Sequence, residues 1–370
     1  MEWLPKYNKL DPAQLEIVQR IVAQGGNHFV EGFPGTGKSV VLAHAAMRCH
    51  EQSGRACAIL TYTNALVACI REGVHGVAVE TIDRFVDHFE GGPIGTLFVD
   101  EAQDLQRTTY RGTPTVATLH RCAGRVVFAA DSAQSLYDDA LPLAEVKAQF
   151  GVDAQHNYLL RVNYRMTKKM LNVLDALFPE RKIEVSTGSL VDDVDVVYGD
   201  ARSQAQSYAW IFRKARDYAE PRDPAAILFA THKQLTDFAA TLLPDVPEAT
   251  LQDRHQLNAS LCDHALPVRF VGNGVGGFSE ADREGMIYLM TMHSAKGLDF
   301  KTVCVPNCQS VSGRYRNLYY VALSRARSNL FLSGFGASPV KEALGQVARI
   351  VPVTPAARAS AAPETNDFPF

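Results

Sequence analysis

The sequence predicts an α/β protein built from two domains, each with a parallel sheet whose two faces are covered by helices. Short apolar runs of strand length alternate with helix-like segments, first in the N-terminal part of the chain and again in the C-terminal part. This alternation is typical of parallel sheets. The 370 residues suffice for two core-building domains, and an apolar fraction of 46% excludes a mostly disordered chain.

The candidate strands fall into two groups. The first group comprises 28–31, 58–61, 96–100 and 126–130, and the second comprises 194–198, 226–230, 287–291, 302–305 and 329–332. We expect the junction between the groups near 137–158, and we assign residues 1–140 to the first domain and 141–335 to the second. Residues 336–370 form a C-terminal segment whose last part is rich in alanine, proline and small polar residues, so we expect that part not to pack.

The overall charge and the cysteine content limit the class of protein. A net charge of −3 argues against a wholly basic nucleic-acid coat but leaves room for a locally basic cleft. Seven cysteines, an odd number, fit a reducing compartment better than a disulfide framework. No stretch approaches the roughly 18 consecutive apolar residues of a membrane helix, and the N-terminus lacks the pattern of a signal peptide. We therefore expect a cytoplasmic protein without a membrane partner.

The strongest motif is a glycine-rich loop between the first candidate strand and a helix-like run. Residues 32–39 read Gly-Phe-Pro-Gly-Thr-Gly-Lys-Ser and fit G-x-x-x-x-G-K-[ST] in the required strand–helix context. Glycines let backbone N–H groups surround phosphate oxygens without a Cβ in the way, and the following helix adds its positive dipole end. We expect Lys38 to reach the β- and γ-phosphates of ATP and Ser39 to bind Mg²⁺. The alternative, a turn that only caps a helix, fits this context less well. The predicted nucleotide-binding positions of the loop are Gly32, Pro34, Gly35, Thr36, Gly37, Lys38 and Ser39.

Two acidic residues follow the third candidate strand. Asp100 comes directly after the apolar run 97–99, and Glu101 follows it. Doubly wound sheets bind ligands at the carboxyl ends of their strands. We expect Asp100 to hold Mg²⁺ through its hydration shell, and Glu101 to orient and deprotonate an attacking water. Read alone, the acidic pair is equally consistent with the cap of the next helix; with the phosphate loop, it favours nucleotide hydrolysis.

A set of short segments accompanies the phosphate loop in a fixed order. They are 10–14 (Leu-Asp-Pro-Ala-Gln), 60–66 (Leu-Thr-Tyr-Thr-Asn-Ala-Leu), 81–85 (Thr-Ile-Asp-Arg-Phe), 100–103 (Asp-Glu-Ala-Gln), 131–137 (Asp-Ser-Ala-Gln-Ser-Leu-Tyr), 163–165 (Asn-Tyr-Arg), 291–300 (Thr-Met-His-Ser-Ala-Lys-Gly-Leu-Asp-Phe) and 320–327 (Tyr-Val-Ala-Leu-Ser-Arg-Ala-Arg). In this order they resemble the Q motif and motifs Ia, Ib, II, III, IV, V and VI of the UvrD/Rep-like branch of superfamily 1 DNA helicases. The resemblance covers most of residues 10–335.

The resemblance implies two tandem RecA-like P-loop NTPase domains with the nucleotide in the cleft between them. In this family, the glutamine of the Q motif, here Gln14, reads the edge of the adenine. The tyrosine of motif IV, here Tyr164, stacks on the adenine. We also expect Gly297 and Asp299 of motif V to lie in the nucleotide site.

The resemblance also implies three residues that act on the γ-phosphate. Motif III provides a sensor glutamine, here Gln134, and motifs IV and VI provide the arginines Arg165 and Arg325. We expect both arginines to come from the second domain, opposite Lys38 and Glu101 of the first. Because arginine fingers contribute about 10³–10⁵ in rate, hydrolysis would require a closed cleft.

Five polar residues are candidates for the path of single-stranded DNA. They are Thr61, Thr63, Asn64, Thr81 and His293. Motifs Ia and Ib contact single-stranded DNA in the resembled family, and hydroxyls and amides at strand ends bind phosphates without excess basic charge. Each threonine is equally consistent with a helix N-cap or a β-branched strand position.

The chain departs from the family in two respects. The intervals 86–96 and 236–286 are too short for the large accessory domains of full-length members. In motif III, Asp138 and Asp139 follow Tyr137 where the family has an aromatic and basic continuation, and acids repel a phosphate backbone. Tyr62, Phe85 and Tyr137 are possible replacements for the stacking residues, but each is equally consistent with a core position.

The leading hypothesis is an Mg²⁺- and ATP-dependent helicase or translocase that moves on single-stranded DNA, with 3′-to-5′ polarity as the resemblance implies. An alternative is an ATP-controlled switch or assembly subunit for a protein partner such as a nuclease. A motor directed to RNA is a third hypothesis, because backbone contacts alone need not reject a 2′-hydroxyl.

Overall fold

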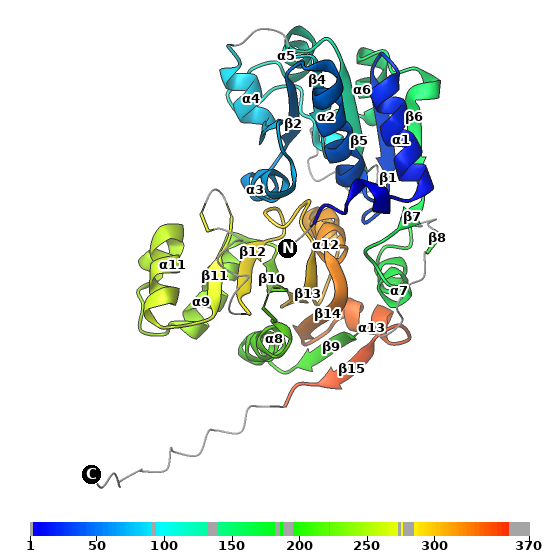
Figure 1. Cartoon of the computed structure of the whole chain (residues 1–370). Helices are drawn as coiled ribbons and strands as arrows, with labels where there is room; N and C mark the ends of the chain where they lie inside the picture. Colours follow the sequence, from blue (N-terminus) through cyan, green and yellow to red (C-terminus); the bar gives the residue numbers. More distant parts are fainter. Residues whose placement is uncertain are drawn as a thin grey trace, which may run out of the picture.

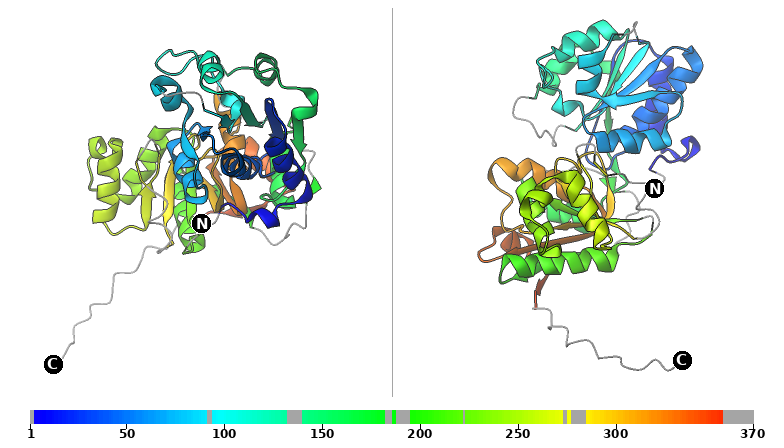
Figure 2. Two further views of the ribbon diagram at one scale, coloured as in Figure 1. Left: turned by 45° about the horizontal axis from the view of Figure 1, so that its top comes forward. Right: turned by 90° about the vertical axis from the view of Figure 1, so that its left-hand side faces the viewer.

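The computed structural model describes residues 3–90, 94–131, 140–181, 186–187, 195–221, 223–272, 275–276 and 285–354. The chain forms two lobes that lie one above the other (Figure 1, Figure 2). Each lobe contains a sheet whose strands all run parallel. The predicted α/β class with two parallel sheets is confirmed.

The first lobe contains a six-stranded sheet in the order β3-β2-β4-β5-β1-β6. Its strands are β1 (His28–Gly32), β2 (Cys57–Thr61), β3 (Ala78–Thr81), β4 (Thr96–Val99), β5 (Val126–Ala130) and β6 (Asn157–Leu160). Its helices are α1 (Pro12–Ala23), α2 (Lys38–Ser53), α3 (Asn64–Gly73), α4 (Ile82–His88), α5 (Thr115–Cys122) and α6 (Leu143–Gln149), with 3-10 turns at Tyr7–Lys9, Ala102–Asp104 and Ala154–His156. Because the strands are parallel, the residues that follow them gather at one edge of the sheet.

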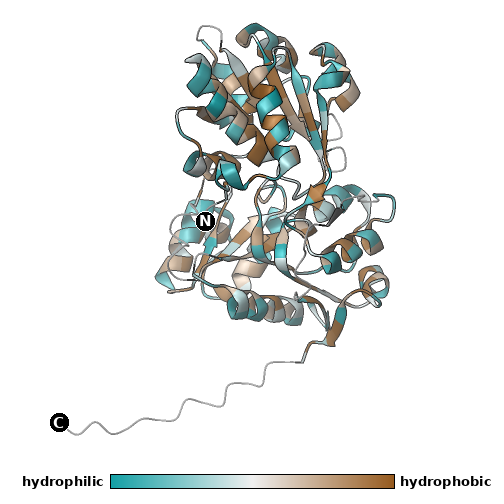
Figure 3. Ribbon diagram, turned by 45° about the vertical axis from the view of Figure 1, so that its right-hand side comes forward, coloured by the Kyte–Doolittle hydropathy of each residue, from teal (hydrophilic) through white to brown (hydrophobic). Residues whose placement is uncertain are grey.

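Alternate strand residues of the first sheet pack into different hydrophobic clusters. Val30 and Val127 join the cluster that contains residues of α1, α2 and α3. Their chain neighbours Phe29 and Phe128 join the cluster with residues of α4, α5 and α6. The period of two therefore buries both faces of the sheet under helices. In Figure 3, the strands are largely hydrophobic in colour and the helices carry the hydrophilic faces.

The second lobe contains a seven-stranded sheet in the order β11-β12-β10-β13-β14-β9-β15. Its strands are β9 (Val196–Ala201), β10 (Ala225–Phe229), β11 (Val268–Phe270), β12 (Ile287–Thr291), β13 (Phe300–Val305), β14 (Ala326–Phe335) and β15 (Arg349–Pro352). Its helices are α7 (Lys168–Leu177), α8 (Gln204–Tyr218), α9 (His232–Leu242), α10 (Glu248–Gln252), α11 (Arg254–Asp263), α12 (Arg316–Leu323) and α13 (Pro339–Leu344), with a 3-10 turn at Gly313–Tyr315. The short strands β7 (Val162–Asn163) and β8 (Ser186–Thr187) form a separate pair.

The division between the lobes differs from the expected position after residue 140. Strand β6 pairs with β1, so α6 and β6 belong to the first lobe. In β6, Tyr158 and Leu160 are buried while Asn157 and Leu159 are exposed, which is the alternation of an edge strand. Like β3 and β15, β6 was not among the predicted strands; its apolar run, Tyr-Leu-Leu, is only three residues long. We propose the division after Leu160, with the second domain extending to residue 354.

The C-terminal segment contributes to the second lobe. Helix α13 packs against α7, and β15 pairs with β9 at the edge of the sheet. The tail that we expect not to pack lies outside the described residues from position 355 onward. None of the helices within the described ranges is long and apolar enough to cross a membrane.

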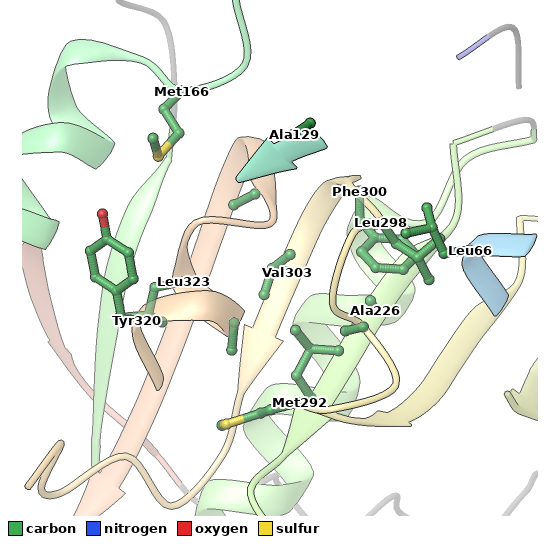
Figure 4. Packing of buried hydrophobic residues seen from close by; sticks show 14 of the residues in the cluster. Leu66, Ala129, Met166, Ala226, Met292, Leu298, Phe300, Val303, Tyr320 and Leu323 are labelled. Carbon is green, nitrogen blue, oxygen red and sulfur yellow. The ribbon is translucent and has the colours of Figure 1, made fainter. Parts of the chain in front are cut away.

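One hydrophobic cluster continues from the first lobe into the second. Figure 4 shows Leu66 of α3 beside Leu298, a residue of the segment between β12 and β13. Ala129 of the first sheet belongs to the same cluster as Val303 and Tyr320 of the second lobe. The lobes therefore share an apolar contact that brings the carboxyl edge of the first sheet against the second lobe.

Candidate nucleotide and nucleic-acid site

The predicted phosphate loop connects β1 to α2. Its backbone needs glycine at Gly37, where φ is +85°, and a Cβ on Gly32 would lie 2.4 Å from the Thr36 hydroxyl oxygen. Lys38 Nζ donates hydrogen bonds to the carbonyl oxygens of Gly32 (2.9 Å) and Phe33 (3.1 Å). The loop thus curls around its own lysine, in the shape that a phosphate group fits.

The predicted metal-binding pair lies directly beside this loop. Asp100 follows β4, is buried, and accepts a hydrogen bond of 2.5 Å from the Ser39 hydroxyl. Burial and the neighbouring Glu101 raise the pKa of Asp100 to about 6. A hydroxyl and a carboxylate are the hard oxygen donors that Mg²⁺ prefers, so these two residues fit the ion.

Glu101 is held by contacts from both lobes. Its backbone lies in the left-handed region with φ of 57°, and its carboxylate accepts a hydrogen bond from the Gln103 amide. Gln103 in turn accepts a hydrogen bond of 2.9 Å from the backbone N–H of Asp131. From the second lobe, Lys296 Nζ lies 3.4 Å from Glu101 Oε2 and also pairs with Asp104.

These cations set the charge state of Glu101. Burial raises the pKa of this carboxyl, but Lys296, Lys38 and Arg325 outweigh burial and lower its pKa to about 2. Glu101 is therefore an ionised carboxylate at neutral pH, as a proton acceptor must be.

The two predicted arginines reach the site by different routes. The Asn163 amide donates to the Pro34 carbonyl oxygen (2.7 Å), and the Tyr164 backbone N–H donates to the Gly35 carbonyl oxygen (2.8 Å). The phosphate loop itself therefore fixes the backbone next to Arg165. Residues 163–165 directly follow β6, so Arg165 lies at the start of the proposed second domain and is bound to the phosphate loop of the first.

Arg325 is a true second-lobe residue. It is buried, and its guanidinium donates to the carbonyl oxygens of Val321 (3.0 Å) and Leu298 (3.2 Å). Burial and the nearby Arg165 lower the pKa of Arg325 to about 10, so the group stays charged at neutral pH. On the same side of the cleft, Asp299 lies 3.4 Å from Arg165.

One cavity of about 460 Å³ brings these side chains together. The predicted site residues in its lining are Gln14, Pro34, Gly35, Gly37, Lys38, Ser39, Glu101, Tyr164, Arg165, Gly297, Asp299 and Arg325. Gly32, Thr36 and Asp100 lie behind this lining. Lys38 and Glu101 belong to the first lobe and Arg325 to the second, so the cavity is a cleft between the lobes.

The predicted adenine residues lie at one end of the cleft. Gln14 donates from its side-chain amide to the Thr36 carbonyl oxygen (3.1 Å) and accepts from the Asp11 backbone N–H, which completes the cap of α1. The Tyr164 hydroxyl donates to Asp11, and the tyrosine is 51% exposed. A half-exposed ring on a cavity wall is available for stacking with a base.

The predicted nucleic-acid residues differ in how accessible they are. Thr61 and Thr81 pair in register at the ends of β2 and β3, and Thr61 is fully buried. The Thr63 hydroxyl accepts from the Leu66 backbone N–H (3.1 Å) and caps α3, so the N-cap alternative holds for this residue. Asn64 and His293 are exposed.

Some predicted residues lie outside the described part of the chain. Gln134, Tyr137, Asp138 and Asp139 all fall within 132–139. Conversely, the sequence predicted no role for Lys296 and Asp104, which form an ion pair between the lobes. Both lie inside the recognised motifs, but no spacing rule links two residues so far apart in the chain.

Comparison with known proteins decides the family. The family described as "Schlafen group 3, DNA/RNA helicase domain" matches residues 26–223, which is more than half of the chain. The chain belongs to this family of helicase domains. The family described as "UvrD-like helicase C-terminal domain" matches residues 286–333 of this helicase domain. The predicted kinship with UvrD-like superfamily 1 helicases, with their tandem RecA-like domains, is confirmed.

Two individual proteins are similar to this helicase domain. A "Probable DNA helicase" of Mycoplasma pneumoniae (strain ATCC 29342 / M129 / Subtype 1) is 26% identical over 264 residues, which cover 64% of this chain and 42% of that protein. The chain thus spans less than half the length of that relative. The solved complex of Arterivirus nonstructural protein 10 (helicase) with DNA has a TM-score of 0.41 at 17% identity, and covers 90% of this chain and 64% of that one.

Proposed function

We propose that this helicase domain is an ATP-driven motor that moves along single-stranded nucleic acid and hydrolyses ATP in the cleft between its lobes. The observation that carries the proposal is the shared cavity, which is lined by Lys38 and Glu101 from the first lobe and Arg325 from the second. A triphosphate site divided between two lobes makes hydrolysis depend on closure of the cleft.

In the proposed reaction, a water oxygen attacks the γ-phosphorus while the bond from that phosphorus to the β–γ bridging oxygen breaks. Glu101 accepts the proton of the water, and Lys38, Arg165 and Arg325 stabilise the negative charge that develops on the phosphate oxygens. Ser39 and Asp100 would hold Mg²⁺, which would neutralise part of the phosphate charge. Gln134 is proposed to sense the γ-phosphate, as the family resemblance implies.

The nucleic acid is proposed to lie across the edges of both lobes. Asn64 and Thr81 in the first lobe and His293 in the second are proposed contacts, with Thr61 and Thr63 supporting the backbone beside them. Each opening and closing of the cleft would then change the distance between the two grips on the strand. DNA with 3′-to-5′ movement is the proposed substrate and direction.

The cysteines support a reducing compartment. All seven are free thiols, and five of them are buried. We propose on this basis that the protein works in the cytoplasm.

The decisive experiment compares ATP turnover by the wild type and the Glu101→Gln variant, with and without single strands of DNA and RNA at two salt concentrations. We expect the variant to lose about 10³-fold or more in turnover while its ATP affinity stays within a few-fold, because glutamine keeps the shape but accepts no proton. Normal turnover by Glu101→Gln would overturn the catalytic assignment.

The same assay separates a motor from an ATP-controlled switch or a nuclease partner subunit. A motor should show a large increase in hydrolysis on adding single strands, and this increase should weaken as salt rises. Hydrolysis that is indifferent to every strand would support the switch instead.

A further inference from the structure

Tyr110 is the most exposed large hydrophobic residue among those that the structure describes. It is 95% exposed, whereas the next most exposed residues of this kind are Tyr164 at 51%, on the wall of the nucleotide cleft, and Leu159 at 48%, on the edge strand β6. An aromatic ring held fully in water gains nothing from burial in the isolated protein. Exposed aromatic residues on rigid supports are typical of binding surfaces.

The turn that carries Tyr110 is tied down on both sides of the ring. The Thr109 and Thr113 hydroxyls both donate to Asp87 Oδ1 of α4, at 2.6 and 2.7 Å. The Thr109 backbone N–H donates to the Thr113 carbonyl oxygen (2.9 Å), and Arg111 lies within hydrogen-bond distance of His88 Nε2 (3.2 Å). The turn is therefore already ordered, so little conformational entropy of the loop is lost when a ligand binds the ring.

The position of the turn connects it to the proposed nucleic-acid edge. Helix α4 begins directly after Thr81 and ends at His88, beside the turn. Its seven residues span roughly 10 Å at 1.5 Å per residue. In Figure 1, α4 and α5 lie next to each other at the end of the first lobe that is far from the second. A strand that leaves Thr81 along α4 therefore arrives at Tyr110.

The charges along this route are mixed: α4 also carries the exposed Asp83, but in each of two ion pairs the arginine is the more exposed partner. Arg84 projects from the middle of α4 and pairs with the half-buried Glu80 at 3.5 Å. Arg111 projects from the turn itself, and its carboxylate neighbour Asp87 is shielded. Exposed arginines beside an aromatic ring suit a phosphate backbone with an unpaired base.

We propose that Tyr110 is a stacking platform for a base of the single strand that extends from Thr81 along α4, with Arg84 and Arg111 beside the phosphates. The inference rests on the proposed strand-binding function. The other described candidates for stacking, Tyr62 and Phe85, are half-buried against the hydrophobic cluster, so Tyr110 presents the exposed ring.

The test measures binding of fluorescent oligothymidylates of increasing length to the full chain by anisotropy. Stacking on one aromatic residue contributes enough for Tyr110→Ala to weaken binding about fivefold or more. We expect this loss only for strands long enough to reach the turn. Tyr110→Phe keeps the ring and should bind like the wild type. Leu159→Ala removes an exposed apolar residue elsewhere and should have no effect.

The outcomes separate this inference from the proposed function. Equal affinity of wild type and Tyr110→Ala at every length would overturn the platform while leaving strand binding intact. A loss in Tyr110→Phe equal to that in Tyr110→Ala would also overturn it, because the hydroxyl and not the ring would then be the contact. If the wild type itself binds no strand of any length, both the proposed function and the stacking role of Tyr110 are overturned.

Discussion

Lys296 of the second lobe forms ion pairs with acidic residues of the first lobe. Its side chain is almost fully buried, and its ammonium group pairs with Asp104 and lies 3.4 Å from Glu101. Burial lowers the pKa of Lys296 to about 8, and Glu101 opposes this shift. Buried charges persist only when they are paired, so each of these groups depends on the others.

Loss of this lysine should destabilise the chain strongly. Lys296→Met removes the nearest cation of two buried carboxylates, and breaking a buried pair in this way costs about 3–5 kcal/mol of the free energy of unfolding. Urea denaturation measures the change. The double variant Lys296→Met/Asp104→Asn should regain part of the loss, because it removes one of the stranded charges; a double variant less stable than the single one would contradict this account.

His28 should make the first lobe sensitive to acid. Burial, with Arg125 and His156 nearby, lowers the pKa of His28 to about 4, and its Nδ1 lies 3.0 Å from the Tyr158 hydroxyl. Below pH 6.5, His28 is protonated in the unfolded chain but stays neutral in the folded chain. The free energy of unfolding therefore falls as the pH drops from about 6.5 to 4. The loss amounts to about 3 kcal/mol.

The free energy of unfolding of wild type and His28→Gln, measured at several pH values, checks this expectation. The variant should have a flatter profile between pH 6.5 and 4, because glutamine does not titrate. Parallel profiles would show that another group is responsible.

The residues that could be predicted from the sequence are those that stand in a recognisable local pattern. Lys38 and Ser39 could be assigned because a strand, a glycine loop and a helix follow one another without a gap. The pairing of Lys296 with Asp104 could not, because the two residues are separated by 192 positions. For the same reason, the anchoring of residues 163–165 to the phosphate loop required the folded chain.

At the scale of elements, a turn in the second lobe packs against α3 so closely that only glycine fits. Gly297 has φ of +79°, and a Cβ placed on it would lie 2.4 Å from Leu66 Cδ2. Its neighbours Lys296 and Asp299 contact Glu101 and Arg165 respectively. The spacing between this turn and α3 therefore sets the position of several groups around the nucleotide.

A methyl group at Gly297 should push this turn away from α3. We expect Gly297→Ala to reduce strand-stimulated ATP turnover by up to about 10²-fold, since small misplacements of catalytic groups have effects of this size. Gly313→Ala is the matched control, because Gly313 also has a positive φ (+65°) but has no atom near its Cβ position. The double variant Gly297→Ala/Leu66→Ala should recover activity; no recovery would mean that backbone strain alone causes the defect.

Most of the strands were predicted from the sequence, but β3, β6 and β15 were not. Strands such as β5 and β10 are apolar and buried throughout, so they are visible in the sequence as continuous apolar runs. Strand β6 is an edge strand with one exposed face, so its pattern is weak and its place beside β1 emerged only from the sheet. The predicted boundary after residue 140 and the boundary that we propose after Leu160 differ for this reason.

At the scale of the whole molecule, the lobes are closed against each other by an apolar contact and by ion pairs across the cleft. Asp299 of the second lobe lies 3.4 Å from Arg165, and within its own lobe it lies 4.0 Å from Arg327. Arg165 is anchored beside the phosphate loop, while Asp299 belongs to the turn that precedes β13. The pair therefore resists separation of the lobes.

Removal of this charge should loosen the closed arrangement. In small-angle X-ray scattering without nucleotide, we expect Asp299→Asn to show a larger radius of gyration than the wild type. Asp223→Asn is the matched control, since Asp223 pairs with Arg327 (2.6 Å) within the second lobe only. An unchanged radius of gyration in Asp299→Asn would show that the apolar contact suffices to hold the lobes together.

The pairing of Arg165 with Asp299 has a consequence for how ATP would enter the proposed site. The arginine already has an anionic neighbour before any substrate arrives, so association is an exchange of counter-ions instead of simple capture by a positive surface. Small anions such as chloride or inorganic phosphate gain little from this exchange, because they would have to displace a tethered carboxylate. In the proposed function, a triphosphate that engages the loop and both arginines at once would displace it, so this salt bridge would make binding depend on the length and charge of the substrate.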